Sequence, residues 1–184
     1  MSAFRSCRIK RLEWTTHMCR PEFSLEQELP LHVEAIEQLH RDAFGPGRFA
    51  RTAFRVREAV CPDSLLSFVA LSEGHLAGSV RLSPISIGKC RALLLGPLAV
   101  HPDFKNAGAG RLLMHRAIEA ARELDYCAIL LVGDFDYYVR FGFERVPLGR
   151  IVMPGPVDPG RLLLLSFDKV ESDLCSGMVR PLIE

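Results

Sequence analysis

The residues best suited to chemistry are Lys105-Asn106-Ala107-Gly108-Ala109-Gly110-Arg111, where an apolar strand pattern gives way to a helical one. Backbone N–H groups at a helix start are unpaired and the helix dipole makes that end positive, so such a turn accepts a phosphate or pyrophosphate. Glycines at 108 and 110 let the anion approach the main chain closely. We therefore predict a pyrophosphate-binding turn at residues 105 to 110.

The spacing of the glycines narrows the choice of ligand. It differs from G-x-G-x-x-G with an acidic residue about 20 positions later, the dinucleotide fingerprint, and from the P-loop pattern G-x-x-x-x-G-K-S/T. A G-x-G after a strand also occurs in tight turns for conformational reasons alone. The pattern therefore disfavours dinucleotides and nucleoside triphosphates, and it leaves a different pyrophosphate ligand.

Two ordered motifs resemble one known family. Leu98-Ala99-Val100 followed by Lys105-x-x-Gly108-x-Gly110 is similar to the acetyl-CoA signature of the GNAT N-acetyltransferases, Q/R-x-x-G-x-G/A, with lysine replacing arginine or glutamine. Tyr138-Val139-Arg140-Phe141-Gly142-Phe143 is similar to the family's F/Y-Y-x-x-x-G-F segment. The resemblance covers roughly residues 23 to 168, and within the family the chain most resembles the bacterial YhbS-like predicted acetyltransferases.

The resemblance implies a co-substrate, acetyl-CoA, and a set of residues that contact it. The strand at residues 98 to 100 is expected to splay from the strand that follows Cys127 and to pair with the pantetheine arm like an added strand. The thioester carbonyl is then expected near a backbone N–H that stabilises the developing oxyanion. The implied cofactor-binding residues are Leu98, Ala99, Val100, Lys105, Asn106, Ala107, Gly108, Ala109, Gly110, Arg111, Tyr138 and Phe141.

Tyr138 is the predicted catalytic residue. It aligns with the family tyrosine that protonates the departing CoA thiolate, and a phenol with an ordinary pKa of about 10 carries its proton near neutrality. The alternative is that Tyr138 packs on the core beside Tyr137 and Phe141, and Tyr137 is expected to be structural.

The acceptor amine has to lose a proton before it attacks, since an alkylammonium has no lone pair. Glu58, His40, His101 and Asp134 are all conceivable bases, as is a water chain, and no spacing singles one out.

Cys127 lies in a buried strand pattern, which favours direct transfer in a ternary complex over a cysteine-linked intermediate. Two alternatives remain open: an acyl-CoA-binding module without catalysis, and an acyltransferase for longer acyl chains.

Composition excludes several other functions. Twenty-three basic and 22 acidic residues give a formal charge of +1, which offers no field for nucleic acid or an anionic membrane. The longest apolar stretch, residues 92 to 100, is about half of the ~20 residues that cross a bilayer.

The histidines form no H-E-x-x-H or comparable set, so we predict no metal. Expected partners are acetyl-CoA and an amine-bearing small molecule or peptide, and a homodimer is plausible.

Six scattered cysteines, in no C-x-x-C pair, are predicted to be reduced thiols of a cytoplasmic protein. They are Cys7, Cys19, Cys61, Cys90, Cys127 and Cys175.

Hydrophobic periodicity predicts an α/β domain with one right-handed strand-helix-strand crossover. The resemblance refines this to a GNAT acyl-CoA N-acyltransferase fold: a mixed, mostly antiparallel sheet flanked by helices, with splayed parallel strands 4 and 5. Gly96-Pro97 predicts a bulge in the fourth strand. The expected helices are residues 30 to 45, 48 to 59 and 108 to 124, and the expected strands 65 to 71, 76 to 85, 92 to 100, 127 to 132, 143 to 146 and 162 to 167.

The chain divides into residues 1 to 21, a flexible extension, residues 22 to 170, the GNAT domain, and residues 171 to 184, a C-terminal tail. The acceptor pocket is expected between the two early helices and the loop at residues 149 to 160, whose Pro154, Pro156 and Pro159 make it rigid.

Overall fold

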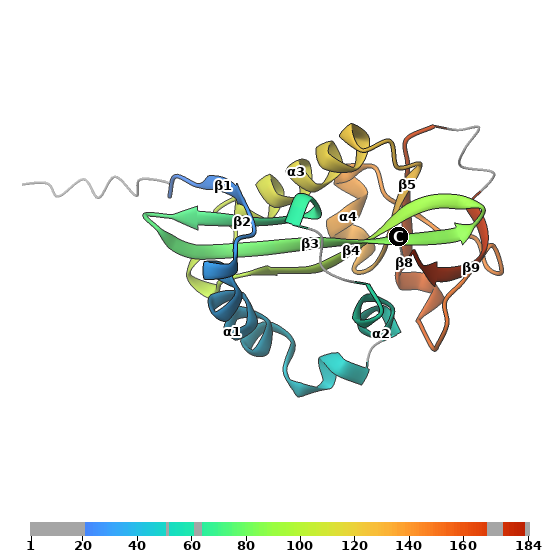
Figure 1. Ribbon diagram of the computed structural model, residues 1–184, viewed down its shortest axis with the longest axis horizontal. Coiled ribbons are helices and arrows are strands. Elements are labelled where there is room, and N and C mark those ends of the chain that lie inside the picture. Colours follow the sequence, from blue (N-terminus) through green and yellow to red (C-terminus); the bar gives the residue numbers. More distant parts are fainter. Residues whose placement is uncertain (1–20, 51, 61–63, 169–174, 183–184) are drawn as a thin grey trace, which may run out of the picture.

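The computed structural model describes residues 21 to 50, 52 to 60, 64 to 168 and 175 to 182, so residues 1 to 20 of the predicted extension lie outside this part. Nine strands form the sheet, with the main order β1-β2-β3-β4-β5-β8-β6 and with β9 joined to β3 and β7. Helix α3 covers one face, while α1 and α2 lie on the other (Figure 1). The single sheet with helices on both faces has the arrangement that the resemblance implied.

Antiparallel pairing builds the first part of the sheet. Strand β1 (Ser24–Gln27) pairs with β2 (Ser67–Ser72), and the Glu73-Gly74 turn leads back into β3 (His75–Gly88). Strand β4 (Cys90–Val100) returns beside β3. The predicted hairpin is confirmed, although β3 is longer than expected and β1 was not foreseen.

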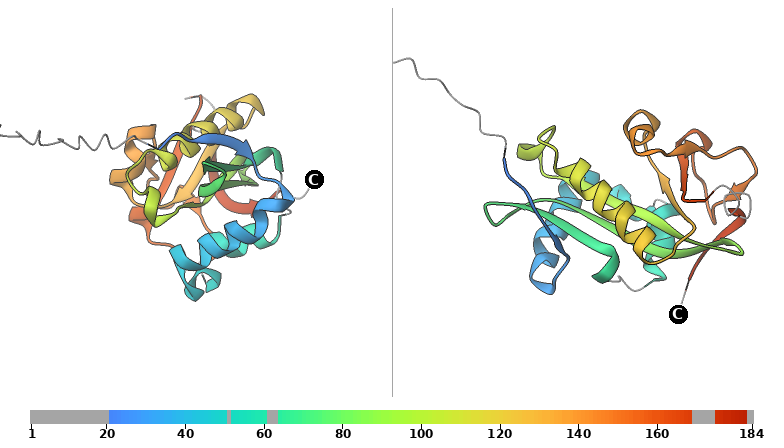
Figure 2. Two further views of the ribbon diagram at one scale, coloured as in Figure 1. Left: turned by 90° about the vertical axis from the view of Figure 1, so that its left-hand side faces the viewer. Right: turned by 90° about the horizontal axis from the view of Figure 1, so that it is seen from above.

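The predicted crossover is confirmed. Helix α3 (Ala109–Glu123) connects β4 to the parallel strand β5 (Ala128–Val132) and lies across the sheet (Figure 2). Its side chains Leu113, Ala117 and Ala120 are almost fully buried, as the periodicity predicted, whereas Leu124, which was expected on the same side, follows the helix and is 39% exposed. The polar residues of α3 face water, so burial of one apolar stripe fixes the orientation of the helix.

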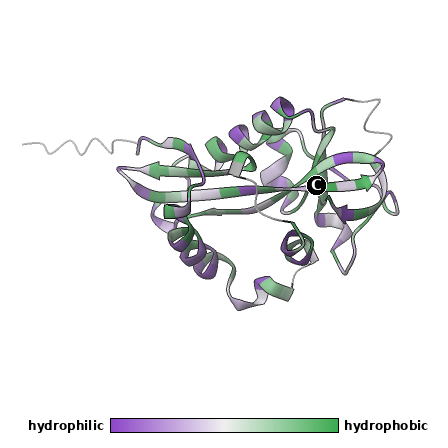
Figure 3. Ribbon diagram, in the orientation of Figure 1, coloured by the Kyte–Doolittle hydropathy of each residue, from purple (hydrophilic) through white to green (hydrophobic). Residues whose placement is uncertain are grey.

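Two early helices cover the opposite face. Helix α1 (Val33–Phe44) packs on β3 and β4 through Ile36 and Leu39, and its hydrophilic residues gather on the side away from the sheet (Figure 3). The second predicted helix is shorter than expected: residues 46 to 50 form a 3-10 turn, and α2 is confined to Thr52–Glu58. Thr52 Oγ1 donates to Pro156 O at 2.7 Å and so ties α2 to the proline-containing loop.

The last strands close the domain. After the short helix α4 (Phe135–Tyr138) come β6 (Glu144–Arg145), β7 (Ile151–Val152) and β8 (Leu162–Ser166), which pairs antiparallel with β5. Strand β9 (Cys175–Pro181) lies in the segment that we set apart as a tail, yet it pairs with β3 and β7. The sheet therefore continues to Pro181.

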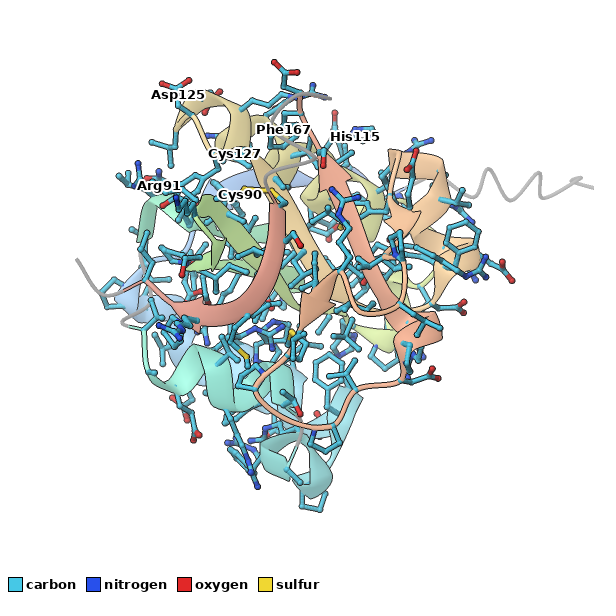
Figure 4. The ribbon with its side chains drawn as sticks, turned by 90° about the vertical axis from the view of Figure 1, so that its right-hand side faces the viewer. Cys90, Arg91, His115, Asp125, Cys127 and Phe167 are labelled. Carbon is cyan, nitrogen blue, oxygen red and sulfur yellow. A yellow bond between two sulfur atoms is a disulfide. The ribbon has the colours of Figure 1, made fainter. Side chains whose placement is uncertain are left out.

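The expectation of reduced thiols was wrong for one pair. Cys90, at the start of β4, forms a disulfide with Cys175, at the start of β9, and their Cα atoms are 5.2 Å apart. Figure 4 faces this end of the sheet and labels Cys90 and the neighbouring Cys127. The pairing of β3 with both β4 and β9 brings the two cysteines together across 85 residues of sequence.

Candidate active site

The site begins where β4 leaves β5. Parallel pairing runs from Ala92 with Ala128 to Leu94 with Leu130 and goes no further. On the other side of β4, the register with β3 shifts because Gly96 and Pro97 both lie opposite Arg81. The bulge and the splay that we predicted are therefore both present, and they open a gap between β4 and β5.

The direction of the main-chain groups along β4 follows from two hydrogen bonds. Cys127 N–H donates to Arg91 O at 3.0 Å, so the main-chain N–H and C=O groups of Arg91 point toward β5. Every second residue of a strand points the same way, so those of Leu95 also point toward β5. His101 N–H donates to Ala77 O at 2.8 Å, so the groups of His101 point toward β3.

Along a strand, the main-chain N–H and C=O groups of successive residues point to opposite sides. Because those of His101 point toward β3, those of Val100 and Leu98 point toward the gap. Since β5 no longer pairs there, these groups are available to a ligand that enters like an added strand.

The predicted pyrophosphate turn adopts the required shape. Asn106 and Gly108 have φ angles of 62° and 113°, in the left-handed region, and Gly108 is the N-cap of α3. The first intrahelical hydrogen bond runs from Leu112 N–H to Gly108 O at 3.1 Å. The N–H groups of the helix residues before Leu112 therefore have no partner within the helix. Together they form a cradle for an anion.

A cleft of about 560 Å³ runs from this cradle to the gap. Three cations, Lys105, Arg111 and Arg140, are among its described lining residues, and no carboxylate is. Such a lining fits the diphosphate and phosphate groups of coenzyme A, so the chain's own residues are suited to this co-substrate. At Gly110 a side chain would lie 2.9 Å from Tyr137 Oη and 3.3 Å from Val100 Cγ2, so glycine keeps the helix start close to the gap.

Ten of the twelve predicted cofactor-binding residues line this cleft. The exceptions are Ala99 and Ala109, which are buried at 4% and 0% exposure and contribute no side chain to it. The sequence reasoning missed three lining residues, Phe104, Tyr137 and Arg140. Arg140 lies within the second motif, from which we had predicted only Tyr138 and Phe141 as cofactor-binding residues. Including every residue of that motif would have identified Arg140.

A second cavity, of about 500 Å³, lies on the α1 and α2 side of the gap. Its lining includes residues of α1, of α2 and of the segment 156 to 158, which belong to the parts from which we expected an acceptor pocket, and also the bulge of β4, which we did not include. Leu98 and Tyr138 line both this cavity and the cleft beside the cradle, so the two spaces border the same two residues.

Tyr138 is held at this junction by its neighbours. Its ring packs edge-on against Tyr137, with centroids 4.9 Å apart, and against Phe143 at 5.8 Å. Burial, assisted by Tyr137, raises the pKa of Tyr138 to about 12, and Arg57 and Arg161 oppose this shift. The phenol therefore carries its proton at neutral pH.

The four conceivable bases lie in different places. Glu58 and His40 line the second cavity, whereas His101 and Asp134 are absent from the described lining of both spaces. Asp134 caps α4 by accepting from Asp136 N–H at 3.3 Å, and His101 Nδ1 accepts from Asp103 N–H at 3.3 Å. His40 Nε2 lies 3.1 Å from Ser79 Oγ, and burial together with nearby arginines lowers its pKa to about 4.

Strands β4 and β5 that separate past Leu94, with the glycine turn and α3 between them, have the arrangement that the GNAT resemblance implied. Residues 33 to 143 match the Acetyltransferase (GNAT) family, which is more than half of the chain, and the protein belongs to that family.

The chain is 29% identical over 122 residues to the uncharacterized N-acetyltransferase YhbS of Escherichia coli K12, covering 64% of this chain and 71% of YhbS. It is also 29% identical over 113 residues to E. coli YjhQ, another uncharacterized N-acetyltransferase, covering 59% of this chain and 62% of YjhQ.

Solved structures agree with the fold. The crystal structure of E. coli YhbS in complex with CoA superposes with a TM-score of 0.74 at 23% identity, covering 88% of this chain and 91% of that one. A GNAT family acetyltransferase from Brucella melitensis, solved with acetyl-CoA, gives a TM-score of 0.65 at 24% identity, covering 86% and 95%.

Two further features of the described residues bear on function. They contain no group of three or more His, Cys, Asp or Glu side chains that could hold a metal ion. Within the same residues, no helix is both long enough and apolar enough to span a bilayer.

Proposed function

We propose that the protein transfers an acetyl group from acetyl-CoA to an amine by direct attack within a ternary complex. One observation carries the proposal: the cleft that would bind the cofactor and the cavity that would bind the acceptor share two lining residues, Leu98 and Tyr138. A donor in the cleft and an acceptor in the cavity would meet beside the one tyrosine that lines both spaces.

Acetyl-CoA supplies the acyl group as a reactive thioester, and the chain's residues position it. The cradle at residues 105 to 111 binds the diphosphate, and the unpaired main-chain groups of Leu98 and Val100 pair with the pantetheine arm. An N–H in this row is suited to donate to the thioester oxygen as negative charge develops there, an interaction typically worth about 3 kcal/mol in the barrier.

Tyr138 then protonates the departing thiolate. Its phenol is still protonated at neutral pH because burial raises its pKa to about 12. The proton lost by the amine passes to Glu58 or to water, because a histidine with a pKa of about 4, such as His40, is a poor acceptor near neutrality. Among described residues Glu58 has no ion-pair partner within 4.0 Å, whereas Glu37 lies near Arg48 and Arg81.

The test combines binding with turnover. Calorimetry measures the affinity for CoA and acetyl-CoA, and labelled acetyl-CoA is then incubated with a library of amines, peptides and antibiotics. Tyr138→Phe is expected to leave acetyl-CoA affinity within about twofold and to lower kcat by about 10² to 10⁴, the usual contribution of an acid catalyst. Tyr126→Phe is the matched control, since it also removes a tyrosine hydroxyl but lines neither space.

The outcomes separate the alternatives. Binding without turnover of any acceptor favours an acyl-CoA-binding module, and a higher kcat/KM for longer acyl chains favours a different acyl donor. No heat of association for CoA or acetyl-CoA with folded protein would reject the proposal outright.

A further inference from the structure

Arg57 of α2 occupies an unusual position in the acceptor cavity. Its Nη2 donates to Leu95 O at 3.1 Å, which is the carbonyl that β4 turns toward β5 just after pairing stops. A side chain at Gly96 would lie 2.8 Å from the same Nη2. The guanidinium thus lies against the bulge, directly beside the reaction junction.

The guanidinium is only partly satisfied. Its Nε is buried and has no hydrogen-bond partner among the described residues. Burial lowers the pKa of Arg57 to about 10, so the group is still a cation at neutral pH. Buried N–H donors and buried charges are normally paired, because leaving them unpaired is costly, so this arrangement is suited to a bound anion.

The other arginines nearby are already engaged. Arg81 donates to Glu28 at 2.7 Å and lies 3.7 Å from Glu37, which also lies 3.8 Å from Arg48. Within the described part of the chain, Arg57 has no carboxylate within 4.0 Å. Arg57 is therefore a cavity cation whose charge no described carboxylate neutralises.

We propose that the acceptor is a small amino acid or amino-acid-like amine whose carboxylate binds Arg57, an inference that rests on the proposed N-acetyltransferase function. Guanidinium and carboxylate are geometrically matched, and such pairs fix orientation as well as affinity. Because Arg57 lies beside the bulge, its anion and the reacting amine belong to the same compact molecule. A cavity of about 500 Å³ accommodates a ligand of this size.

A second cation lies in the same cavity. Arg161 lines it together with Arg57, and the carboxylates Glu37, Glu58 and Asp158 also contribute to the lining. Arg161 Nε donates to Gly133 O at 3.5 Å, so it has capacity to assist in binding an anion.

Matched pairs of acceptors test the inference. Free amino acids are compared with their C-terminal amides, with acetyl-CoA as donor and CoA release as the readout. The carboxylates are expected to exceed their amides in kcat/KM by at least about 30-fold, the lower end for breaking a buried charge pair. Arg57→Gln is expected to abolish this preference while acetyl-CoA affinity stays within about twofold, and Arg57→Lys is expected to restore part of it.

The control is Arg55→Gln, which removes a cation from the exposed side of the same helix and outside the cavity lining. Amides or polyamines used as well as the carboxylates would overturn the inference while leaving the proposed function intact. So would a loss in Arg57→Gln that is equal for acid and amide acceptors.

A binding experiment covers the case without turnover. Calorimetry with N-acetyl amino acids and their amides, in the presence of CoA, is expected to detect the acids with wild type and not with Arg57→Gln. Equal affinities for acid and amide, or no binding of either, would again reject recognition of a carboxylate.

Discussion

Gly133 is the position from which the placement of Tyr138 is tested most directly. It follows β5, and a Cβ built on it would lie 2.9 Å from Cδ2 of the Tyr138 ring and closer still to Cε2. Ordinary carbon contacts are about 3.5 to 4.0 Å, so Gly133→Ala forces the ring to retreat by roughly 1 Å. The same Cβ would lie 2.9 Å from Leu131 Cδ1, and φ of Gly133 lies outside the left-handed region, so the effect comes from side-chain contacts rather than from backbone strain.

A displacement of about 1 Å at a catalytic group costs on the order of 10² in rate. We therefore expect kcat of Gly133→Ala to fall about 100-fold, with acetyl-CoA affinity nearly unchanged and the free energy of unfolding lowered by about 1 to 3 kcal/mol through overpacking. Steady-state kinetics, calorimetry and urea denaturation measure the three quantities. Gly47→Ala is the control, because a Cβ there meets nothing within 4 Å.

A double-mutant cycle decides whether Gly133 acts through Tyr138. If it does, adding Gly133→Ala to Tyr138→Phe lowers kcat little further, since the position of an absent hydroxyl no longer matters. A folded Gly133→Ala variant with wild-type kcat, or an effect fully additive with Tyr138→Phe, would refute the role assigned to Tyr138.

Three further perturbations follow from the structure. Gly108→Ala meets no atom within 4 Å but must adopt a φ of 113°, so about 1 to 2 kcal/mol of strain should weaken CoA binding roughly tenfold; unchanged affinity by calorimetry contradicts the cradle. The pKa of His40 is about 4 in the folded protein and ordinarily 6.5, so the unfolded chain binds more protons between these pH values. The free energy of unfolding should therefore rise by up to about 3 kcal/mol from pH 4 to pH 6.5. Urea denaturation of His40→Gln should show a smaller rise. Reducing the Cys90–Cys175 disulfide should lower the free energy of unfolding by about 2 to 4 kcal/mol. A reductant should therefore lower the melting temperature of wild type but not that of Cys90→Ala. If the reductant leaves the melting temperature of wild type unchanged as well, the bond is not formed.

Features governed by local backbone preference were predictable from the sequence. The pyrophosphate turn at Gly108, helix α3 and the bulge at Gly96-Pro97 each depend on residues within a few positions of one another. Ten predicted cofactor-binding residues line one cleft because the turn and the second motif are each contiguous in sequence. The family resemblance placed Tyr138 beside that cleft, a position that no local rule provides.

Other features were decided only by tertiary structure, because they depend on partners that are distant in sequence. Arg57 and Leu95 are 38 residues apart, and in the sequence Arg57 is one of several cations on a short helix. The spacing of Cys90 and Cys175 carries no sign of a bond, which exists because β3 pairs with both strands that carry them. Likewise, burial beside arginines, which depends on how α1 packs on the sheet, makes His40 a weak base. The sequence by itself thus determined where coenzyme A is expected, while packing between distant segments decided what surrounds the acceptor.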